Sequence, residues 1–229
     1  MKGLGKLIWR FVKLTLIAFI AISVLGVIVY RFINPPVTWL MITRGFERKA
    51  DGKDWKIDKE WRDLDEMAAN MPRAAIAGED GTFLSHHGFD FNAIERAAKR
   101  NRKGKKVIGG STITQQTAKN VFLWSGRSWI RKGFEAYFTV LIEIFWSKQR
   151  IMEVYLNVIE MGDGIYGVQA AAQEYYHKDA KDLTRSQCAA IASILPSPLH
   201  WSPTNPSKYV SHRQFLIKKN MRRLGPLDF

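Results

Sequence analysis

The sequence is poor in cysteine and in the alternating apolar and polar pattern of strands. Its single cysteine, Cys188, excludes an intrachain disulfide and a zinc site built on cysteines. Cys188 lies in the apolar run QCAAIASIL, which indicates a small buried side chain. Repeats, low-complexity tracts and linkers between large domains are also missing. A chain of 229 residues with 46% hydrophobic side chains is therefore expected to form one domain with a short appendage.

Acidic residues are the scarcer charged type, because 35 Lys and Arg face 21 Asp and Glu and give a formal net charge of +14. Part of this excess lies at the N-terminus, where five basic residues occur without an intervening acid: Lys2, Lys6, Arg10, Lys13 and Arg31. The remainder is still basic, which indicates an anionic partner. Nucleic acid, an anionic membrane surface and a phosphorylated substrate all fit this charge.

Charge is absent from Leu14 to Tyr30, in the run LTLIAFIAISVLGVIVY. As a helix this run spans roughly 26 Å, slightly less than the ~30 Å hydrocarbon core of a bilayer. Phe32 and Ile33 extend it if Arg31 reaches the headgroups. A cleaved signal peptide is the alternative, but its apolar region is typically ~7–15 residues long, and no small-x-small cleavage site follows here. We predict a transmembrane anchor over 14–33.

The charges around this anchor predict its orientation. Four basic residues precede the span and only Arg31 follows it at once, which favours a cytoplasmic N-terminus, residues 1–13. Residues from about 34 onward would then lie outside. We expect 34–54, which begins with Pro35-Pro36, to be a juxtamembrane linker. A basic domain in that compartment argues against a nucleic-acid partner.

The body, residues 55–229, is predicted to be mainly α. Helix N-caps and capping boxes mark several starts, and Pro196-x-Pro198 marks a stop. The expected helices begin at Asn92 (to about Arg102), Thr112 (to about Leu123), Ser128 (to about Trp146), Ser147 (through Ile159) and Thr184. A small-residue helix is expected after the run GDGIYGVQAAA.

The first stretch that holds candidate catalytic residues is EDGTFLSHHGFD, Glu79 to Asp90. Glu79 follows the apolar run AAIAG, where partial desolvation would raise its pKa and suit it to proton transfer. His86 and His87 are adjacent and cannot share a helix face as metal ligands. A capped loop with a solvated acid pair explains the same residues, and spacing alone does not decide between the two.

Three further stretches follow. In GGSTITQQTAKN, two glycines lead into a helix that presents N–H groups to an anion, without the spacing of a nucleotide P-loop. In SGRSWIRKGFEAYF, Arg131 and Lys132 share one helix side with Glu135, among aromatic residues that suit contact with lipid. In SKQRIMEVYLN, Ile151, Tyr155 and Val158 form a core stripe, while Glu153 and Asn157 lie on a face that braces a neighbour.

Together these stretches resemble the peptidoglycan glycosyltransferase family, specifically its monofunctional biosynthetic members. The resemblance covers roughly residues 55–220 and rests on four ordered motifs, the first three being E-D-x-x-F-x-x-H-x-G, G-G-S-T-I-T-Q-Q-x-x-K-N and R-K-x-x-E. The matching residues are Glu79, Asp80, Phe83, His86 and Gly88; Gly109 to Asn120; Arg131, Lys132 and Glu135; and, in the fourth, Ile151, Glu153, Tyr155, Leu156 and Asn157.

The resemblance implies a lysozyme-like helical domain with a small apolar lobe facing the membrane. It also implies that the 4-hydroxyl of lipid II attacks a polyprenyl-diphosphate-linked glycan, with inversion and release of undecaprenyl diphosphate. Glu79 would be the general base, and Glu135 would assist near the diphosphate, directly or through a divalent cation. The substrate-binding residues would be Ser111, Thr112, Gln115, Gln116, Lys119, Asn120, Arg127, Arg131 and Lys132. Asp80, Phe83, His86, Gly88, Gly109 and Gly110 would support them.

Cofactors and partners follow from the same resemblance. No histidine or carboxylate spacing specifies a tight metal site, so any Mg²⁺ or Mn²⁺ would bind weakly, mostly through substrate phosphate, and no organic cofactor is expected. The expected partners are lipid II, the lipid-linked nascent glycan, the membrane, and cell-wall synthesis or division proteins, but not nucleic acid. The expected location is a bacterial inner membrane, with the catalytic domain in the periplasm.

Two features depart from the family pattern. His177 occupies the glycine position of the aromatic-aromatic-Gly-Lys sequence found in much of the family. The S-x-x-K, S-x-N and K-T-G motifs of the bifunctional members do not occur, so no transpeptidase activity is expected. Two other functions stay open. A glycan-cleaving enzyme would use Glu79 as general acid but would not need cations around a diphosphate. A non-catalytic precursor-binding protein would tolerate the loss of Glu79.

Overall fold

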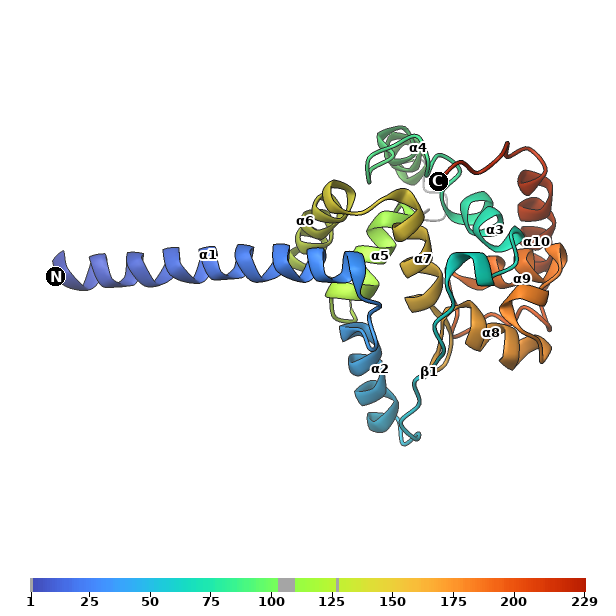
Figure 1. Cartoon of the computed structure of the whole chain (residues 1–229), viewed down its shortest axis with the longest axis horizontal. Helices are drawn as coiled ribbons and strands as arrows, with labels where there is room; N and C mark the ends of the chain where they lie inside the picture. The colour runs from blue at the N-terminus through green and yellow to red at the C-terminus, as the bar shows by residue number, and fades with distance from the viewer. Residues whose placement is uncertain (1, 103–109, 127) are drawn as a thin grey trace. The chain divides into compact units, whose positions relative to one another are not determined.

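The computed structural model describes residues 2–102, 110–126 and 128–229, and the chain divides into two compact units, Met1–Asn34 and Pro35–Phe229. The first unit is one helix, α1 (Lys2–Phe32) (Figure 1). Gly3–Phe32 within it is long and apolar enough to cross a membrane, consistent with a single-pass anchor. The helix begins earlier than the predicted span, because no proline or other strong helix breaker separates the basic residues from the apolar run.

The second unit is mainly helical, as predicted, with one small sheet (Figure 1). Its elements are α2 (Trp39–Ala50), β1 (Asp58–Lys59), η1 (Leu64–Glu66), α3 (Asn70–Glu79), α4 (Phe91–Arg102), α5 (Ile113–Phe122), α6 (Trp129–Phe145), α7 (Lys148–Val158), β2 (Glu160–Gly162), β3 (Ile165–Tyr166), α8 (Gly167–Tyr176), η2 (Ala180–Asp182), α9 (Arg185–Ile194) and α10 (Lys208–Met221).

Four of the five predicted helix caps are confirmed. The side chains of Thr112, Ser128, Ser147 and Thr184 each accept a hydrogen bond from the backbone N–H three residues on, at the starts of α5, α6, α7 and α9. The fifth prediction is wrong by two residues. Asp90, not Asn92, caps α4, since its Oδ1 accepts from the Ala93 N–H at 2.7 Å. A carboxylate at this position also meets the positive end of the helix dipole.

The stretch expected to be a juxtamembrane linker contains α2. Thr38 caps this helix, and Leu40 and Met41 are buried in the second unit. α2 packs against α5, which carries the second sequence motif. The polypeptide before residue 55 therefore contributes to the packed body.

The core centres on α7, whose predicted apolar stripe is confirmed, with Ile151, Tyr155 and Val158 fully buried. The bracing face is confirmed as well. Asn157 accepts from the Arg62 N–H at 2.9 Å and donates to the Arg62 carbonyl at 2.8 Å, and Glu153 accepts from Leu64 N–H at 3.4 Å. α7 thereby fixes the segment that leads from β1 to α3.

The small sheet was not predicted, because its strands are only two or three residues long. Its order is β1-β3-β2, with β1 parallel and β2 antiparallel to β3. α8 follows the sheet directly, as the expected small-residue helix. It ends at His177, whose φ of 53° is left-handed and is the conformation that favours glycine at a helix C-terminus.

The remaining packing brings distant segments together. α3 packs against α9 and α10, while α5 packs against α6 and α7. Cys188 on α9 is buried, as predicted, and burial raises the pKa of its thiol to about 12. The C-terminal end of α3, the body of α5 and one face of α10 meet at Glu79.

Candidate active site

Glu79, the last residue of α3, has a largely buried side chain, 11% exposed. The Gln116 amide donates to its Oε2 at 2.9 Å, and Arg213 pairs with its Oε1 at 2.5 Å. Burial raises the pKa of the carboxyl above its ordinary value, while Arg213, Gln116 and Lys119 oppose the rise and Asp80 adds to it. A carboxylate in this setting is poised to accept a proton nearer neutral pH than a solvated one.

Arg213, on α10, is a site residue that the sequence analysis missed. Its Nε donates to the Ser193 carbonyl at 3.1 Å and its Nη2 to the Gly78 carbonyl at 3.0 Å. These two hydrogen bonds hold the guanidinium in place independently of its contact with Glu79. Arg213 lies 134 positions away from Glu79. In the sequence it is one of several basic residues in α10, and no local pattern distinguishes it from the others.

Asp80 and His86, from the first motif, form a structural network. The Asp80 carboxylate accepts from the Ile113 N–H at 3.0 Å and from His86 Nε2 at 2.9 Å. His86 Nδ1 accepts from the Gly88 N–H at 3.1 Å, so the ring proton lies on Nε2. This network ties the loop after α3 to the first turn of α5, which places Glu79 beside Gln116.

Gly88 and Phe83 complete the loop. Gly88 has φ of 84°, and a Cβ there would lie 2.7 Å from Thr139 Cγ2, so only glycine fits. Phe83 is fully buried. Thr112 donates its hydroxyl to the Gly88 carbonyl at 2.7 Å, a second tie between this loop and α5.

The first turn of α5 uses most of its polar groups internally. Thr112 and Gln115 form a capping box and are buried. Ser111 is exposed and Gly110 half-buried, while Gly109 and Arg127, both expected in the site, lie outside the described residues. Ser111 is therefore the side chain of this turn best placed to meet a ligand.

Gln116 lies at the centre of the site. Its Oε1 accepts from the Tyr155 hydroxyl at 3.2 Å, which directs its amide nitrogen to Glu79. Burial raises the pKa of Tyr155 well above its ordinary value, so this hydroxyl remains a donor. Asn120, one turn further on, is buried and donates to the Gln116 carbonyl at 2.7 Å.

The Lys119 ammonium group makes no hydrogen bond or ion pair with any other side chain or backbone group in the part of the chain that the structure describes. Burial lowers the pKa of its ammonium group; Glu135 and Glu160 oppose this shift and Arg131 adds to it. An unpaired, partly buried cation is a ready binding group for an anion, because the anion supplies the partner that the fold does not.

Glu135, on α6, is held by the predicted cluster. Arg131 pairs with its Oε2 at 3.3 Å and Lys132 with its Oε1, and Lys132 also donates to Ser111 at 3.3 Å. The Glu135 side chain is only 4% exposed. Both of its oxygens are engaged, so the carboxylate orients two cations and is not itself free.

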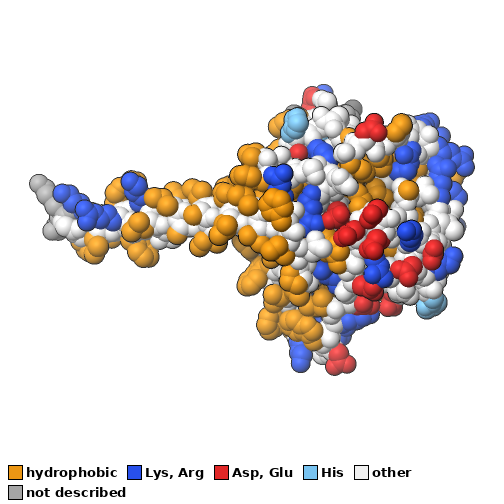
Figure 2. Space-filling model, in the orientation of Figure 1, with side chains coloured by type: hydrophobic (Ala, Val, Ile, Leu, Met, Phe, Trp, Pro, Cys, Tyr) orange, Lys and Arg blue, Asp and Glu red, His pale blue; other side chains and the backbone are white. Residues whose placement is uncertain are grey.

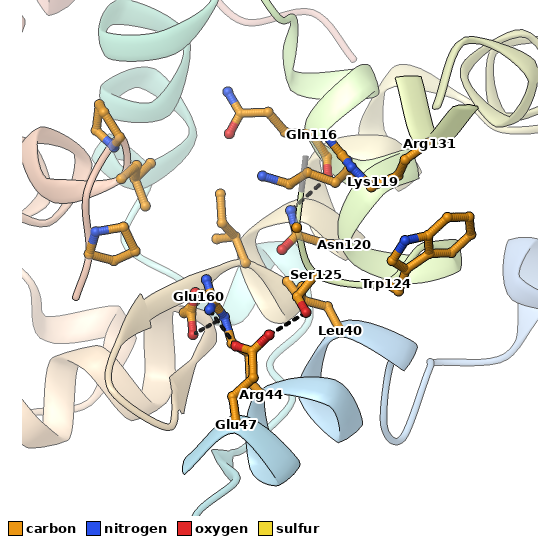
Figure 3. Close-up of a pocket in the computed structure, with 15 residues that line it drawn as sticks. Leu40, Arg44, Glu47, Gln116, Lys119, Asn120, Trp124, Ser125, Arg131 and Glu160 are labelled. Atoms are coloured by element: carbon orange, nitrogen blue, oxygen red, sulfur yellow. Dashed lines mark hydrogen bonds and ion pairs between the residues drawn. The ribbon is translucent and has the colours of Figure 1, made fainter. Parts of the chain in front are cut away.

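Two cavities flank the Glu79–Gln116 hydrogen bond. The smaller, about 200 Å³, is lined by Glu79, Asp80, Gly81, Thr82, Asp90, Ala93, Gly110, Ser111 and Thr112. The larger, about 430 Å³, includes Gln116, Lys119, Asn120 and Arg131 together with residues of α2 (Figure 3). The structure thus places the carboxylate in one cavity and the unpaired ammonium in the other, joined through Gln116.

Apolar side chains gather on the surface of the second unit over α2 and α6 (Figure 2). On α6, Trp129 is 92% exposed, and Ile130 and Ile144 are also exposed. Trp39 and Phe46 of α2 are exposed as well. Exposed apolar side chains that gather on a surface mark contact with a membrane or a partner.

Comparison with known proteins identifies the family. Residues 50–222 match the family model described as Transglycosylase. Several relatives are named biosynthetic peptidoglycan transglycosylase. That of Caulobacter vibrioides is 51% identical over 98% of this chain and 99% of its own length. That of Xanthomonas oryzae pv. oryzae is 49% identical over 94% of this chain and 89% of its own length. That of Pseudomonas syringae pv. syringae is 47% identical over 97% of this chain and 94% of its own length.

The chain therefore belongs to the transglycosylase family, in the group of biosynthetic peptidoglycan transglycosylases. It is an enzyme, a glycosyltransferase. The sequence-based assignment to this family is confirmed.

Proposed function

We propose that the enzyme polymerises glycan chains of peptidoglycan. It transfers a polyprenyl-diphosphate-linked glycan to the GlcNAc 4-hydroxyl of lipid II, with inversion and release of undecaprenyl diphosphate. The observation that carries this proposal is the pair of cavities around Glu79 and Gln116. A reaction between two lipid-linked sugars needs a proton acceptor on one side and a group for the leaving diphosphate on the other, and Glu79 and Lys119 supply them.

In this mechanism Glu79 acts as general base. It takes the proton of the 4-hydroxyl as that oxygen bonds to the anomeric carbon, and the bond from this carbon to the diphosphate breaks, with its electron pair leaving on the phosphate. Because Arg213 and Gln116 bind the carboxylate, they favour its charged form, which is the form a base requires.

The cations stabilise the leaving group. Lys119 and Arg131 line the larger cavity, and the Nζ of Lys132 donates a hydrogen bond to the Ser111 hydroxyl. Fixed positive charges near a departing diphosphate lower the barrier because the charge develops there in the transition state. We assign Arg127 to the same task from the family resemblance alone. Glu135, with both oxygens engaged, acts as the positioning residue for Arg131 and Lys132.

We propose that this site holds no tightly bound metal. Among the described residues no group of three His, Cys, Asp or Glu side chains is arranged to hold a metal, and each Glu135 oxygen already pairs with a cation. Any Mg²⁺ or Mn²⁺ would therefore arrive with the substrate diphosphate and bind through its phosphate oxygens. No step of the mechanism depends on it.

The setting of the reaction is part of the proposal. We place α1 across the bacterial inner membrane, with the N-terminus in the cytoplasm and the catalytic domain in the periplasm, because the basic residues concentrate before the apolar run. The exposed apolar side chains of α2 and α6 would then contact the bilayer that carries both substrates. Cell-wall synthesis or division proteins are its proposed partners, and we propose no transpeptidase activity.

The test is incubation of the full-length protein in detergent with purified lipid-linked disaccharide-peptide, followed by electrophoresis of the glycan. Wild type should yield polymer. Glu79→Gln should retain substrate binding but lower the rate by about 10²–10⁴-fold, the usual contribution of a general base. Substantial polymer from this variant would refute the role of Glu79. Shortening of preformed glycan by wild type, or binding without any product, would instead support a cleaving enzyme or a binding protein.

A further inference from the structure

The larger cavity has a wall that lies outside the region matched by the family model. The match begins at residue 50, whereas Leu40, Arg44 and Glu47, all on α2, line the cavity opposite Lys119 and Asn120 of α5 (Figure 3). α2 is therefore part of the walls of this cavity.

Arg44 is the cation of this wall, and its hydrogen-bonding capacity is incompletely used. Its Nη1 donates to Glu47 at 2.6 Å, and its Nε lies 3.3 Å from a Glu160 oxygen. That Nε is buried and makes no hydrogen bond within the described residues. A guanidinium has five N–H donors, and among the described residues only the Nη1 of Arg44 makes a hydrogen bond, so donors remain for a ligand.

Glu160 holds Arg44 from the protein side. Its side chain is 8% exposed, and burial raises its pKa while Arg44 and Lys119 lower it. The contact with Glu47 is different, because both of those side chains are substantially exposed, at 31% and 45%. Exposed ion pairs of this kind contribute little free energy, so Arg44 can exchange Glu47 for a stronger anion at small cost.

The arrangement repeats the one on α6. There Arg131 also lines the cavity and is held by a buried carboxylate, Glu135. Both guanidinium groups are close enough to Lys119 to lower the pKa of its ammonium. Two braced arginines and one unpaired lysine thus converge on one cavity from three helices.

We propose that Arg44 binds the diphosphate of the lipid-linked substrate together with Lys119 and Arg131, and that Glu160 positions its guanidinium. This inference rests on the proposed function, because that function supplies the diphosphate. A guanidinium suits the task, since its planar fork donates two parallel hydrogen bonds to phosphate oxygens.

The test measures binding of farnesyl diphosphate, a short prenyl diphosphate, to the full-length protein in detergent by calorimetry. Arg44→Ala should weaken binding roughly tenfold, as expected for the loss of charge-assisted hydrogen bonds. Arg44→Lys should recover part of the loss. Arg48→Ala is the matched control: Arg48 lies one turn further along α2, pairs with Asp163 and does not line the cavity, so this variant should bind within twofold of wild type.

Farnesol, which lacks the phosphates, separates phosphate recognition from a general change of shape. Its affinity should be the same for wild type and Arg44→Ala. The inference is overturned if Arg44→Ala binds farnesyl diphosphate within twofold of wild type, if Arg48→Ala loses as much, or if wild type binds the diphosphate no better than farnesol. Failure of wild type to polymerise lipid-linked precursor would refute the proposed function separately, whatever these affinities show.

Discussion

Glu79 and Glu135 are both buried carboxylates, yet their surroundings differ. Glu79 lines a cavity and is bound by an amide and an arginine from two other helices. Glu135 is enclosed by Arg131 and Lys132 of its own helix and lines neither described cavity. The comparison teaches that burial alone does not identify a catalytic acid or base. Access to a cavity and the origin of the partners distinguish Glu79, the proposed reacting group, from Glu135, the proposed positioning residue.

Replacing Glu135 is the strongest way to break this comparison after Glu79→Gln. Glu135→Gln removes the charge that holds Arg131 and Lys132, so the cations lose their fixed geometry. We expect kcat/KM for the lipid-linked precursor to fall about 10- to 100-fold, with a rise in KM, because a charged hydrogen-bonding partner is lost. Polymerisation assays over a range of precursor concentrations measure both constants.

Glu79→Gln differs from Glu135→Gln in how the loss of kcat/KM divides between kcat and KM. Glu79→Gln should lower kcat at nearly unchanged KM, since the base acts in the transition state. Thermal unfolding of both variants shows whether the fold is intact. A Glu135 variant whose whole loss is in kcat, with unchanged KM and unfolding temperature, would make Glu135 a reacting group and remove the distinction drawn above.

The pH dependence sharpens the account of Glu79. Its base form is the ionised one, so activity should rise with pH through the raised pKa of this carboxyl. The positive charge of Arg213 is the strongest influence that lowers the pKa of Glu79. Arg213→Gln removes this charge and raises that pKa further, so the acid limb of the kcat/KM profile should move to higher pH. The other charged or titratable groups facing Glu79, namely Lys119, Asp80 and Tyr155, are unchanged in this variant.

Arg185→Gln is the matched control, because Arg185 ties α9 to the Lys218 carbonyl of α10 and is not among the charged groups that act on Glu79. The acid limb of Arg185→Gln should coincide with that of wild type. The acid limb of Arg213→Lys should fall at a pH between those of Arg185→Gln and Arg213→Gln. An unshifted acid limb in Arg213→Gln would show that Arg213 serves only to join α10 to α3.

The smallest effect is expected at His177, which contacts neither carboxylate. Its φ of 53° costs free energy in any residue with a Cβ. His177→Gly should therefore raise the free energy of unfolding by about 0.5–1 kcal/mol, the gain from the relieved strain being partly offset by the freer unfolded chain. Denaturant titration measures the change. His177→Ala should show no such gain, and polymerisation rates of both variants should equal that of wild type.

Elements of the fold were predictable from the sequence where they depend on residues close together in the chain. Caps at Thr112, Ser128, Ser147 and Thr184 were predictable because they depend on residues three positions apart. The strands were not, because two or three residues carry no periodicity. α2 was missed because the proline pair and the nearby anchor suggested a linker, although Thr38 and the apolar residues after it give a cap and a buried face.

The candidate site divides in the same way. The motifs located Glu79, Gln116, Lys119 and Glu135, since each lies in a distinctive local stretch. They did not reveal Arg213 or Arg44, which reach the site from α10 and α2 and have ordinary sequence neighbours. The motifs also predict Thr112 and Gln115 to be binding residues, whereas in the structure the side-chain oxygens of both form a capping box.

By itself, the sequence determined the helical class, the apolar N-terminal run and the family, and it supplied most of the candidate site residues, because each of these follows from local composition or spacing. Only the tertiary structure decided which charges are paired. It left the Lys119 ammonium without a partner among the described residues, enclosed Glu135 between two cations and brought Arg213 to Glu79. The physical reason is that pairing and burial depend on side chains far apart in the chain, and these two properties decide whether a charged group reacts, positions another or binds a substrate.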